Sequence, residues 1–281
     1  MAIISGPIVV PLDGSKNAEE AVAPAATLAK AAGVAVRFVH VLDGEQLTTA
    51  ADRSRASEIF QAYVARLAAA NGLPEASVSN TVLDGNAAKE VIDFAKDAAI
   101  IVLATHGRSG LRASLIGSVA DKIVRGAKVP VLAIPLGGAD PFSGKPFVVA
   151  VDGSPASEKG LALGRTLAGA FTAKVCLVRA YSIPPPAGIE LVTYPVDLST
   201  TLKEAAEEYL AKAAQPGESI YCEMSAPVDA IDAVSKAVDA AIVVVTSHGK
   251  GFATRIALGS VTERVLHTVR RPVLVVPVSA L

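Results

Sequence analysis

The sequence has no tryptophan, only two cysteines and two methionines in 281 residues, and only 4% aromatic residues. Its cysteines, Cys176 and Cys222, share no CxxC spacing and have no companion cysteine in the first half of the chain. This usage is typical of thiols in a reducing compartment and not of disulfides or redox sites. We therefore expect both thiols to be buried, and we expect no redox chemistry.

Long apolar runs and blocks of one charge are also missing. Apolar residues make up 51% of the chain, but no run approaches the roughly 20 residues that a membrane-spanning helix needs. The 26 basic residues balance 27 acidic ones without forming a basic block, which argues against a general nucleic-acid binder. The start, MAIISGPIVVPLDG, lacks the basic segment of a secretory signal. We expect a cytoplasmic protein with neither membrane nor nucleic acid as a partner.

The same motifs occur twice in the same order. IVVPLDGS at residues 8–15 returns as FVVAVDGS at 147–154, and LIGSVADKIVRGAKVPVLAIP at 115–135 returns without a gap as ALGSVTERVLHTVRRPVLVVP at 257–277. The chain is long enough for two domains of about 140 residues. We predict two domains, repeat one at 1–137 and repeat two at 146–281, joined by the Gly- and Pro-containing linker GGADPFSGKP at 137–146.

Each repeat alternates Val/Ile-rich runs with Ala-rich amphipathic stretches, which predicts strand-helix-strand units around a parallel sheet. Runs such as AIIVLAT do not alternate polar and apolar residues, as expected of strands covered by helices on both faces. The fold class is therefore α/β, with a five-stranded parallel open sheet in each repeat. The predicted strands are 7–12, 35–42, 77–83, 99–105, 130–135, 147–151, 174–180, 218–224, 240–246 and 272–277. The helices predicted in repeat one are 16–32, 54–71, 86–97 and 115–126.

An aspartate ends the first strand of each repeat. Ligands of open parallel sheets bind beyond the carboxyl ends of the strands, where Asp13 and Asp152 can accept hydrogen bonds from ribose hydroxyls. Asp-Gly is also typical of a turn, and Ser15 and Ser154 are natural N-caps of the following helix. The residues leave both interpretations open. A second irregular stretch, SIPPPAGIELVTYP at 182–195, is predicted to be a loop near the same edge.

The end of the fourth strand carries the most informative pattern. In repeat one ATHG at 104–107 is followed after nine residues by Gly117-Ser118, and in repeat two TSHG at 246–249 is followed after nine residues by Gly259-Ser260. Glycine lets a backbone approach an anion closely, and the N–H groups at a helix N-terminus attract phosphate. Both serines also fit a capping box, so they can merely cap their own helices. Capping explains neither the upstream His-Gly nor the identical spacing, and we favour a phosphate site.

His106 and His248 are two of only four histidines. Neither has a second metal ligand at a suitable spacing or an adjacent nucleophile, which favours positioning or hydrogen bonding over catalysis. We assign no catalytic or metal-ligating residue. The chain also lacks a Walker A motif, a glycine-rich dinucleotide motif and a nucleophile elbow, so phosphate binding here uses a different device.

These motifs resemble those of the universal stress protein family, and in particular its members with two domains in one chain; the resemblance covers both halves almost end to end. The family's ATP-binding signature is glycine, two residues, glycine, nine residues, glycine, then serine or threonine, on a five-stranded parallel sheet of order 3-2-1-4-5. The second and third glycines and the serine match in both repeats. Ala104 and Thr246 occupy the first position, and we expect the β-branched Thr246 to crowd a phosphate or stiffen the backbone.

The resemblance implies which residues contact a nucleotide. Asp13 and Asp152 would face the ribose, Pro11 would border the adenine, and Val41 and its counterpart Ala180 would meet the adenine through the backbone. The phosphates would lie among the signature residues and their neighbours, which are Ala104, His106, Gly107, Arg108, Gly117, Ser118 and Val119 in repeat one and Thr246, His248, Gly249, Lys250, Gly259, Ser260 and Val261 in repeat two. The implied cofactor is ATP, or AMP, ADP or a cyclic adenine nucleotide, with Mg²⁺ accompanying the nucleotide.

The resemblance also implies an assembly and a role. Family members pair their last strands edge to edge, here PVLAIP and PVLVVP, so that one chain would form its own pseudo-dimer, with a further homodimer left open. We expect a non-catalytic or very slowly hydrolysing adenine-nucleotide binding module in a stress response. The alternatives are an ATPase or adenylyl-transfer enzyme, and a structural scaffold whose sites have become capped helices.

Overall fold

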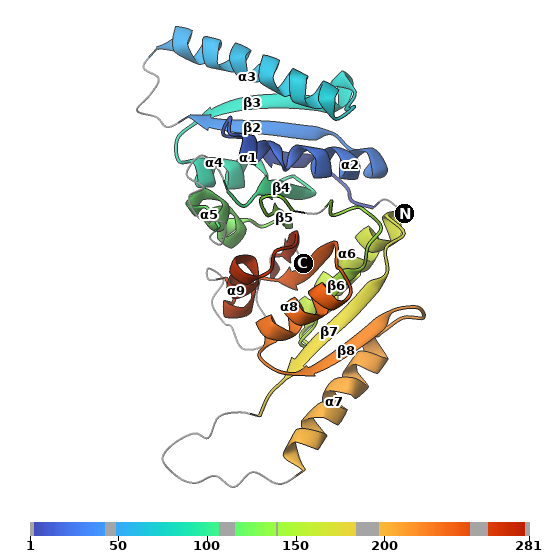
Figure 1. Ribbon diagram of the computed structural model, residues 1–281. Helices are drawn as coiled ribbons and strands as arrows, with labels where there is room; N and C mark the ends of the chain where they lie inside the picture. Colours follow the sequence, from blue (N-terminus) through green and yellow to red (C-terminus); the bar gives the residue numbers. More distant parts are fainter. Residues whose placement is uncertain are drawn as a thin grey trace, which may run out of the picture.

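The computed structural model describes residues 3–42, 49–106, 116–138, 140–183, 197–247 and 258–278. They form one ten-stranded sheet with helices on both faces (Figure 1). The strand order is β3-β2-β1-β4-β5-β10-β9-β6-β7-β8. Each repeat therefore contributes five parallel strands in the order 3-2-1-4-5, which confirms the predicted fold class.

The ten predicted strands agree with the observed strands to within two residues at each end. Repeat one contains β1 (Ile8–Pro11), α1 (Lys16–Glu19), α2 (Val22–Ala32), β2 (Val36–Leu42), α3 (Ala50–Ala70), the 3₁₀ turn η1 (Glu75–Ser77), β3 (Val78–Asp84), α4 (Ala87–Phe94), β4 (Ile100–Ala104), α5 (Ser118–Gly126) and β5 (Val131–Ile134). Repeat two contains β6 (Phe147–Ala150), α6 (Pro155–Ala170), β7 (Val175–Tyr181), α7 (Leu198–Ala213), β8 (Ser219–Met224), α8 (Pro227–Ala237), β9 (Ile242–Thr246), α9 (Ser260–Thr268) and β10 (Val273–Val276).

The core consists of two apolar layers, one on each face of the sheet. Because side chains alternate along a strand, Ile8 and Val10 enter one layer and Val9 enters the other, and all three are fully buried. The first layer packs against α1, α2, α3, α6 and α7, and the second against α4, α5, α8 and α9. Both layers run through both repeats, so the sequence pattern of uninterrupted apolar runs reflects strands covered on each side.

The first helix of repeat one is divided, and the prediction of a single helix at 16–32 is wrong. Pro24 has no N–H to donate to the carbonyl of Glu20, and its ring clashes with that carbonyl in a regular helix. Between α1 and α2 the backbone instead forms hydrogen bonds to the third residue back, from Glu20 N to Asn17 O and from Ala21 N to Ala18 O, each 3.2 Å. Repeat two has Leu163 where repeat one has Pro24, and there α6 is continuous.

The last strands of the two repeats meet in the middle of the sheet. β5 and β10 pair antiparallel, with Val131 opposite Val275 and Ala133 opposite Val273, and we call this pairing the seam. The residues of the predicted linker that the structure describes belong to no helix or strand, and some of them form turns. Among them Phe142 is buried and stacks on Phe171 at 4.2 Å between ring centroids, which ties the linker to repeat two.

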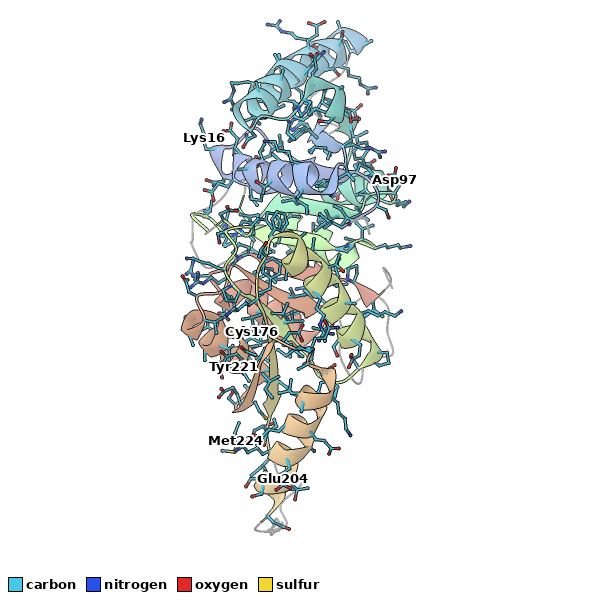
Figure 2. All side chains as sticks on the ribbon, turned by 90° about the vertical axis from the view of Figure 1, so that its right-hand side faces the viewer. Lys16, Asp97, Cys176, Glu204, Tyr221 and Met224 are labelled. Atoms are coloured by element: carbon cyan, nitrogen blue, oxygen red, sulfur yellow. The ribbon has the colours of Figure 1, made fainter. Side chains whose placement is uncertain are left out.

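The molecule is elongated, with Lys16 and Asp97 in one half of Figure 2 and Met224 and Glu204 toward the far end of the other. Cys176, in β7, is buried as predicted, but Cys222 is only half-buried and the prediction for it is wrong. Cys222 lies on β8, the outermost strand, where one side of the strand has no neighbour to cover it. Within the described ranges, no helix is both long and apolar enough to cross a membrane.

Candidate functional site

Each repeat begins with a tight turn that holds an aspartate at the end of its first strand. The glycine after the aspartate has φ of 82° in repeat one and 76° in repeat two, a left-handed conformation that glycine adopts without strain. The Oδ1 atom of Asp13 accepts hydrogen bonds from Ser15 N (2.9 Å) and Ser15 Oγ (2.6 Å), and that of Asp152 accepts one from Ser154 N (2.9 Å). These bonds fix each carboxylate at the carboxyl edge of the sheet.

The serines of these turns are N-caps, as one interpretation predicted. Ser15 Oγ accepts from Ala18 N at 3.2 Å, and Ser154 Oγ accepts from Ser157 N at 3.2 Å. The two interpretations of the Asp-Gly-Ser motif are compatible, because the serine caps the helix while the aspartate lines a cavity.

The helices after the fourth strands begin on glycine. Gly117 and Gly259 are the N-cap residues, extended with ψ of 150° and 143°, and each donates its N–H to a carbonyl at the strand end at 2.6 Å. Ser118 and Ser260 are already helical, so the capping-box interpretation is wrong. Among the described residues, no side chain caps α5 or α9. The first turn of each helix therefore presents backbone N–H groups that attract an anion.

A cavity of about 290 Å³ lies at the carboxyl ends of β1, β2 and β4. Every residue predicted for the site of repeat one that the structure describes borders this cavity: Pro11, Asp13, Val41, Ala104, His106, Gly117, Ser118 and Val119. His106 is 7% exposed, and its Nδ1 lies 2.8 Å from Thr105 Oγ1. Gly107 and Arg108 lie outside the described residues.

A second cavity, of about 320 Å³, occupies the same place in repeat two. It brings together the predicted residues Asp152, Ala180, Thr246, Gly259, Ser260 and Val261. The predicted residues His248, Gly249 and Lys250 lie outside the described residues, as does most of the loop predicted at 182–195. Both cavities therefore join the end of the first strand to the start of the uncapped helix.

Sequence reasoning missed the walls of both cavities, which are mainly but not wholly apolar. The added residues in repeat one are Leu12, Ala18, Val39, His40, Ala87, Val91, Leu103, Thr105, Ala120 and Ile123. In repeat two they are Ala150, Val151, Ser157, Val178, Arg179, Pro227, Ile231, Val245 and Thr262. The walls from α4 and α8 carry no motif, because isolated Ala, Val, Pro and Ile residues form them.

Thr246 is accommodated by a glycine of the neighbouring helix. A Cβ atom on Gly160 of α6 would lie 2.6 Å from Thr246 Cγ2, so the threonine methyl group occupies space that only glycine leaves free. The carbonyl of Thr246 accepts a hydrogen bond from Thr262 Oγ1 at 2.6 Å. The methyl group that we expected to crowd a phosphate therefore packs against α6, although Thr246 still borders the cavity.

The first turn of each of these helices contains one acidic residue, Asp121 in α5 and Glu263 in α9. Arg125 pairs with both carboxylates at 2.8 Å. Hydrogen bonds to Asp121, and then to Glu263, raise the pKa of the Arg125 guanidinium above its usual value.

Comparison with known proteins identifies the class of this protein. The model of the Universal stress protein family matches residues 5–135 and again residues 144–277. Universal stress protein Rv2005c of Mycobacterium tuberculosis is 30% identical over 291 residues, which cover 95% of this chain and 96% of that protein. The chain belongs to the universal stress protein family, with two domains of the family in tandem.

Other similar proteins agree in length and fold. Universal stress protein Rv1996 of Mycobacterium tuberculosis is 27% identical over 304 residues, covering 95% of this chain and 94% of that protein. The crystal structure of a universal stress protein from Archaeoglobus fulgidus has a TM-score of 0.73 at 19% identity and covers 96% of this chain and 98% of that chain. At 19% identity, the similarity to the Archaeoglobus fulgidus structure shows a shared fold only.

Proposed function

We propose that each repeat binds one adenine nucleotide, with its phosphates at the start of α5 or α9 and its ribose at Asp13 or Asp152. One observation carries the proposal: in both repeats the aspartate and the first turn of the helix border the same cavity. N–H groups at a helix N-terminus attract phosphate oxygens, and a carboxylate accepts hydrogen bonds from ribose hydroxyls.

The cavity walls suit a flat apolar base. In repeat one the base would lie among Val39, Val41, Val91 and Leu103, all of which border the cavity, while Pro11 closes one side. Volumes of about 290 and 320 Å³ are near the lower end of the range of about 300–1,000 Å³ for small-molecule sites. An adenosine moiety with its phosphates directed outward suits this size.

The role that we propose is nucleotide binding in a stress response in the cytoplasm, with very slow hydrolysis or none. From the family signature, Gly107 and Arg108 in repeat one and His248, Gly249 and Lys250 in repeat two are proposed to contact the phosphates, with Mg²⁺ bound to the nucleotide. Within the described part of the chain, no group of three or more His, Cys, Asp or Glu residues could hold a metal ion. The nucleotide's own phosphates are therefore proposed to supply the main Mg²⁺ ligands.

The scaffold alternative has less support. It requires side-chain caps in place of a ligand, whereas no described side chain caps α5 or α9. The enzymatic alternative makes a different measurable demand, which is phosphate release during steady-state incubation with ATP and Mg²⁺.

The test is to denature freshly purified protein, identify the released small molecules by mass spectrometry, and titrate the emptied protein with ATP, ADP, AMP and cyclic AMP by calorimetry. We expect an adenine nucleotide in the released fraction and binding of up to two nucleotides per chain. The scaffold would be favoured if no nucleotide is released and if none of the four nucleotides gives binding heat or a thermal shift. Phosphate release well above the protein-free rate would favour the enzyme.

A further inference from the structure

One guanidinium joins the two helices that carry the proposed phosphate sites. Arg125, in the last turn of α5, donates from Nε to Asp121 Oδ2 and from Nη2 to Glu263 Oε1, both at 2.8 Å. Glu263 belongs to the first turn of α9, so the second bond crosses from repeat one to repeat two. Figure 1 shows α5 and α9 next to each other beside the seam.

The two carboxylates occupy the same position in the two repeats. Asp121 follows Ser118 by three residues, and Glu263 follows Ser260 by three residues. An acidic side chain in the first turn interacts favourably with the helix dipole, but it repels an anion bound at the same helix end. Each proposed site therefore has an unfavourable charge beside it, and the single positive charge of Arg125 offsets part of both.

Among its described residues, repeat two does not supply a second bridge of this kind. The residue equivalent to Arg125 is His267, in the last turn of α9. Its Nδ1 is buried and has no hydrogen-bond partner among the described residues, and its ring borders a small cavity of about 20 Å³ with Thr105 and His106. Within the part of the chain that the structure describes, Arg125 is the residue that serves both helices.

We infer that Arg125 raises the affinity of both sites for phosphate groups by offsetting part of the negative charge of Asp121 and Glu263. The inference rests on the proposed nucleotide binding and adds a residue that contacts neither cavity. The Arg125 side chain is 31% exposed and its partners are 26% and 42% exposed, so these ion pairs contribute little to folding stability. Arg125 is thus a positioning residue whose effect depends on the charge of the ligand.

The experiment compares calorimetric titrations of ATP and of adenosine, which carries no phosphate, into wild-type protein and Arg125→Gln. Each site is measured alone by repeating the titrations in two further backgrounds. Gly259→Val closes the site of repeat two and leaves that of repeat one, and Gly117→Val closes the site of repeat one and leaves that of repeat two. We expect Arg125→Gln to weaken ATP binding about two- to fivefold at each site and to leave adenosine binding unchanged. The triple variant R125Q/D121N/E263Q should bind ATP at least as tightly as the wild type, because both carboxylates that repel phosphate are gone.

The matched control is Arg37→Gln, which removes the same charge from an ion pair with Asp97 at the amino ends of the strands. Three results would overturn the inference while the proposed function stands. They are equal ATP affinity in R125Q and R37Q, a loss of adenosine affinity in R125Q as large as its loss of ATP affinity, and no recovery of ATP affinity in the triple variant. Wild-type protein that binds no ATP would overturn the proposed function and the inference with it.

Discussion

The two repeats build the same site on differently packed helices. In repeat two, Gly160 of the first helix faces Thr246 at the end of the fourth strand. The corresponding residues of repeat one are both alanine, Ala21 in place of Gly160 and Ala104 in place of Thr246. The methyl group that Thr246 adds lies where Gly160 leaves space. The two differences compensate each other, so neither can be judged alone.

The features that both repeats share belong mainly to the backbone. Both have the Asp-Gly-Ser turn with its left-handed glycine, and both have a glycine N–H bonded at 2.6 Å to the end of the fourth strand. The helices behind these turns differ: α1 and α2 are divided near Pro24, whereas α6 runs without a break. Backbone turns thus place the aspartate and the helix start in both repeats, while the supporting helices vary in compensating ways.

The largest expected effect is on repeat two, from Leu163→Pro. The substitution introduces the proline of repeat one into the middle of α6, which lacks the tighter turn that accommodates Pro24. We expect the free energy of unfolding to fall by about 3 kcal/mol or more in urea titrations followed by circular dichroism. Leu163→Ala is the control for lost packing, and equal stability of the two variants would show that both repeats tolerate a divided helix.

Charging each helix start tests whether the two sites are equivalent. Ser118→Asp and Ser260→Asp each place a carboxylate in the first turn, and we expect ATP affinity at the altered site to fall about ten- to a hundredfold. Calorimetry should show one remaining site per chain in each variant, with Ser118→Ala and Ser260→Ala as neutral controls. Two full sites after either charged substitution would contradict the assigned phosphate position.

Exchanging the compensating pair tests the packing difference directly. Gly160→Ala places a Cβ 2.6 Å from Thr246 Cγ2, and we expect a loss of about 1–2 kcal/mol in the free energy of unfolding. Gly160→Ala with Thr246→Ala, the alanine pair of repeat one, should recover most of that loss. Gly169→Ala in the same helix is the matched control, because a Cβ there meets nothing within 4 Å. Additive effects in the double-mutant cycle would reject compensation.

The smallest expected effect is a dependence on alkaline pH that arises on the outer side of repeat two. Burial, and then a hydrogen bond to Glu158, raise the pKa of Tyr209 to about 12 from its ordinary value of 10.0. A raised pKa in the folded state contributes stability below pH 10 that is lost as the pH rises toward 12.

The corresponding variant is Tyr209→Phe. Thermal unfolding midpoints measured between pH 9 and pH 12 should fall less in this variant than in the wild type. Tyr221→Phe is the matched control, and a wild-type-like decline in Tyr209→Phe would count against the role of Tyr209. The two repeats differ at this point, because Glu19, the counterpart of Glu158 in repeat one, forms an ion pair with Arg66 at 3.0 Å.

Much of the fold could be predicted because buried parallel strands leave an uninterrupted apolar run, and the repeat shows each run twice. The divided helix was also visible in principle, since Pro24 lies inside the predicted helix 16–32 and proline disrupts a helix interior. The exposure of Cys222 depends on strand order, which places β8 at the edge.

The site could be predicted only at positions where the backbone geometry requires a particular residue type, so that a motif appears in the sequence. The repeated Gly-Ser pair nine residues after His-Gly marked Gly117 and Ser118, because a close backbone approach to an anion requires glycine. The apolar walls from α4 and α8 and the bond from Arg125 to Glu263 left no such signal. Arg125 and Glu263 are 138 residues apart, and their contact depends on the pairing of β5 with β10.

The seam has a further consequence for how the two halves stay together. A strand has two hydrogen-bonding edges, and β5 uses one on β4 and the other on β10, while β10 uses its own on β9 and β5. Neither strand has an edge left for another chain. A short linker keeps the partner strand at an effective concentration on the order of millimolar, so the pairing within one chain does not depend on the protein concentration.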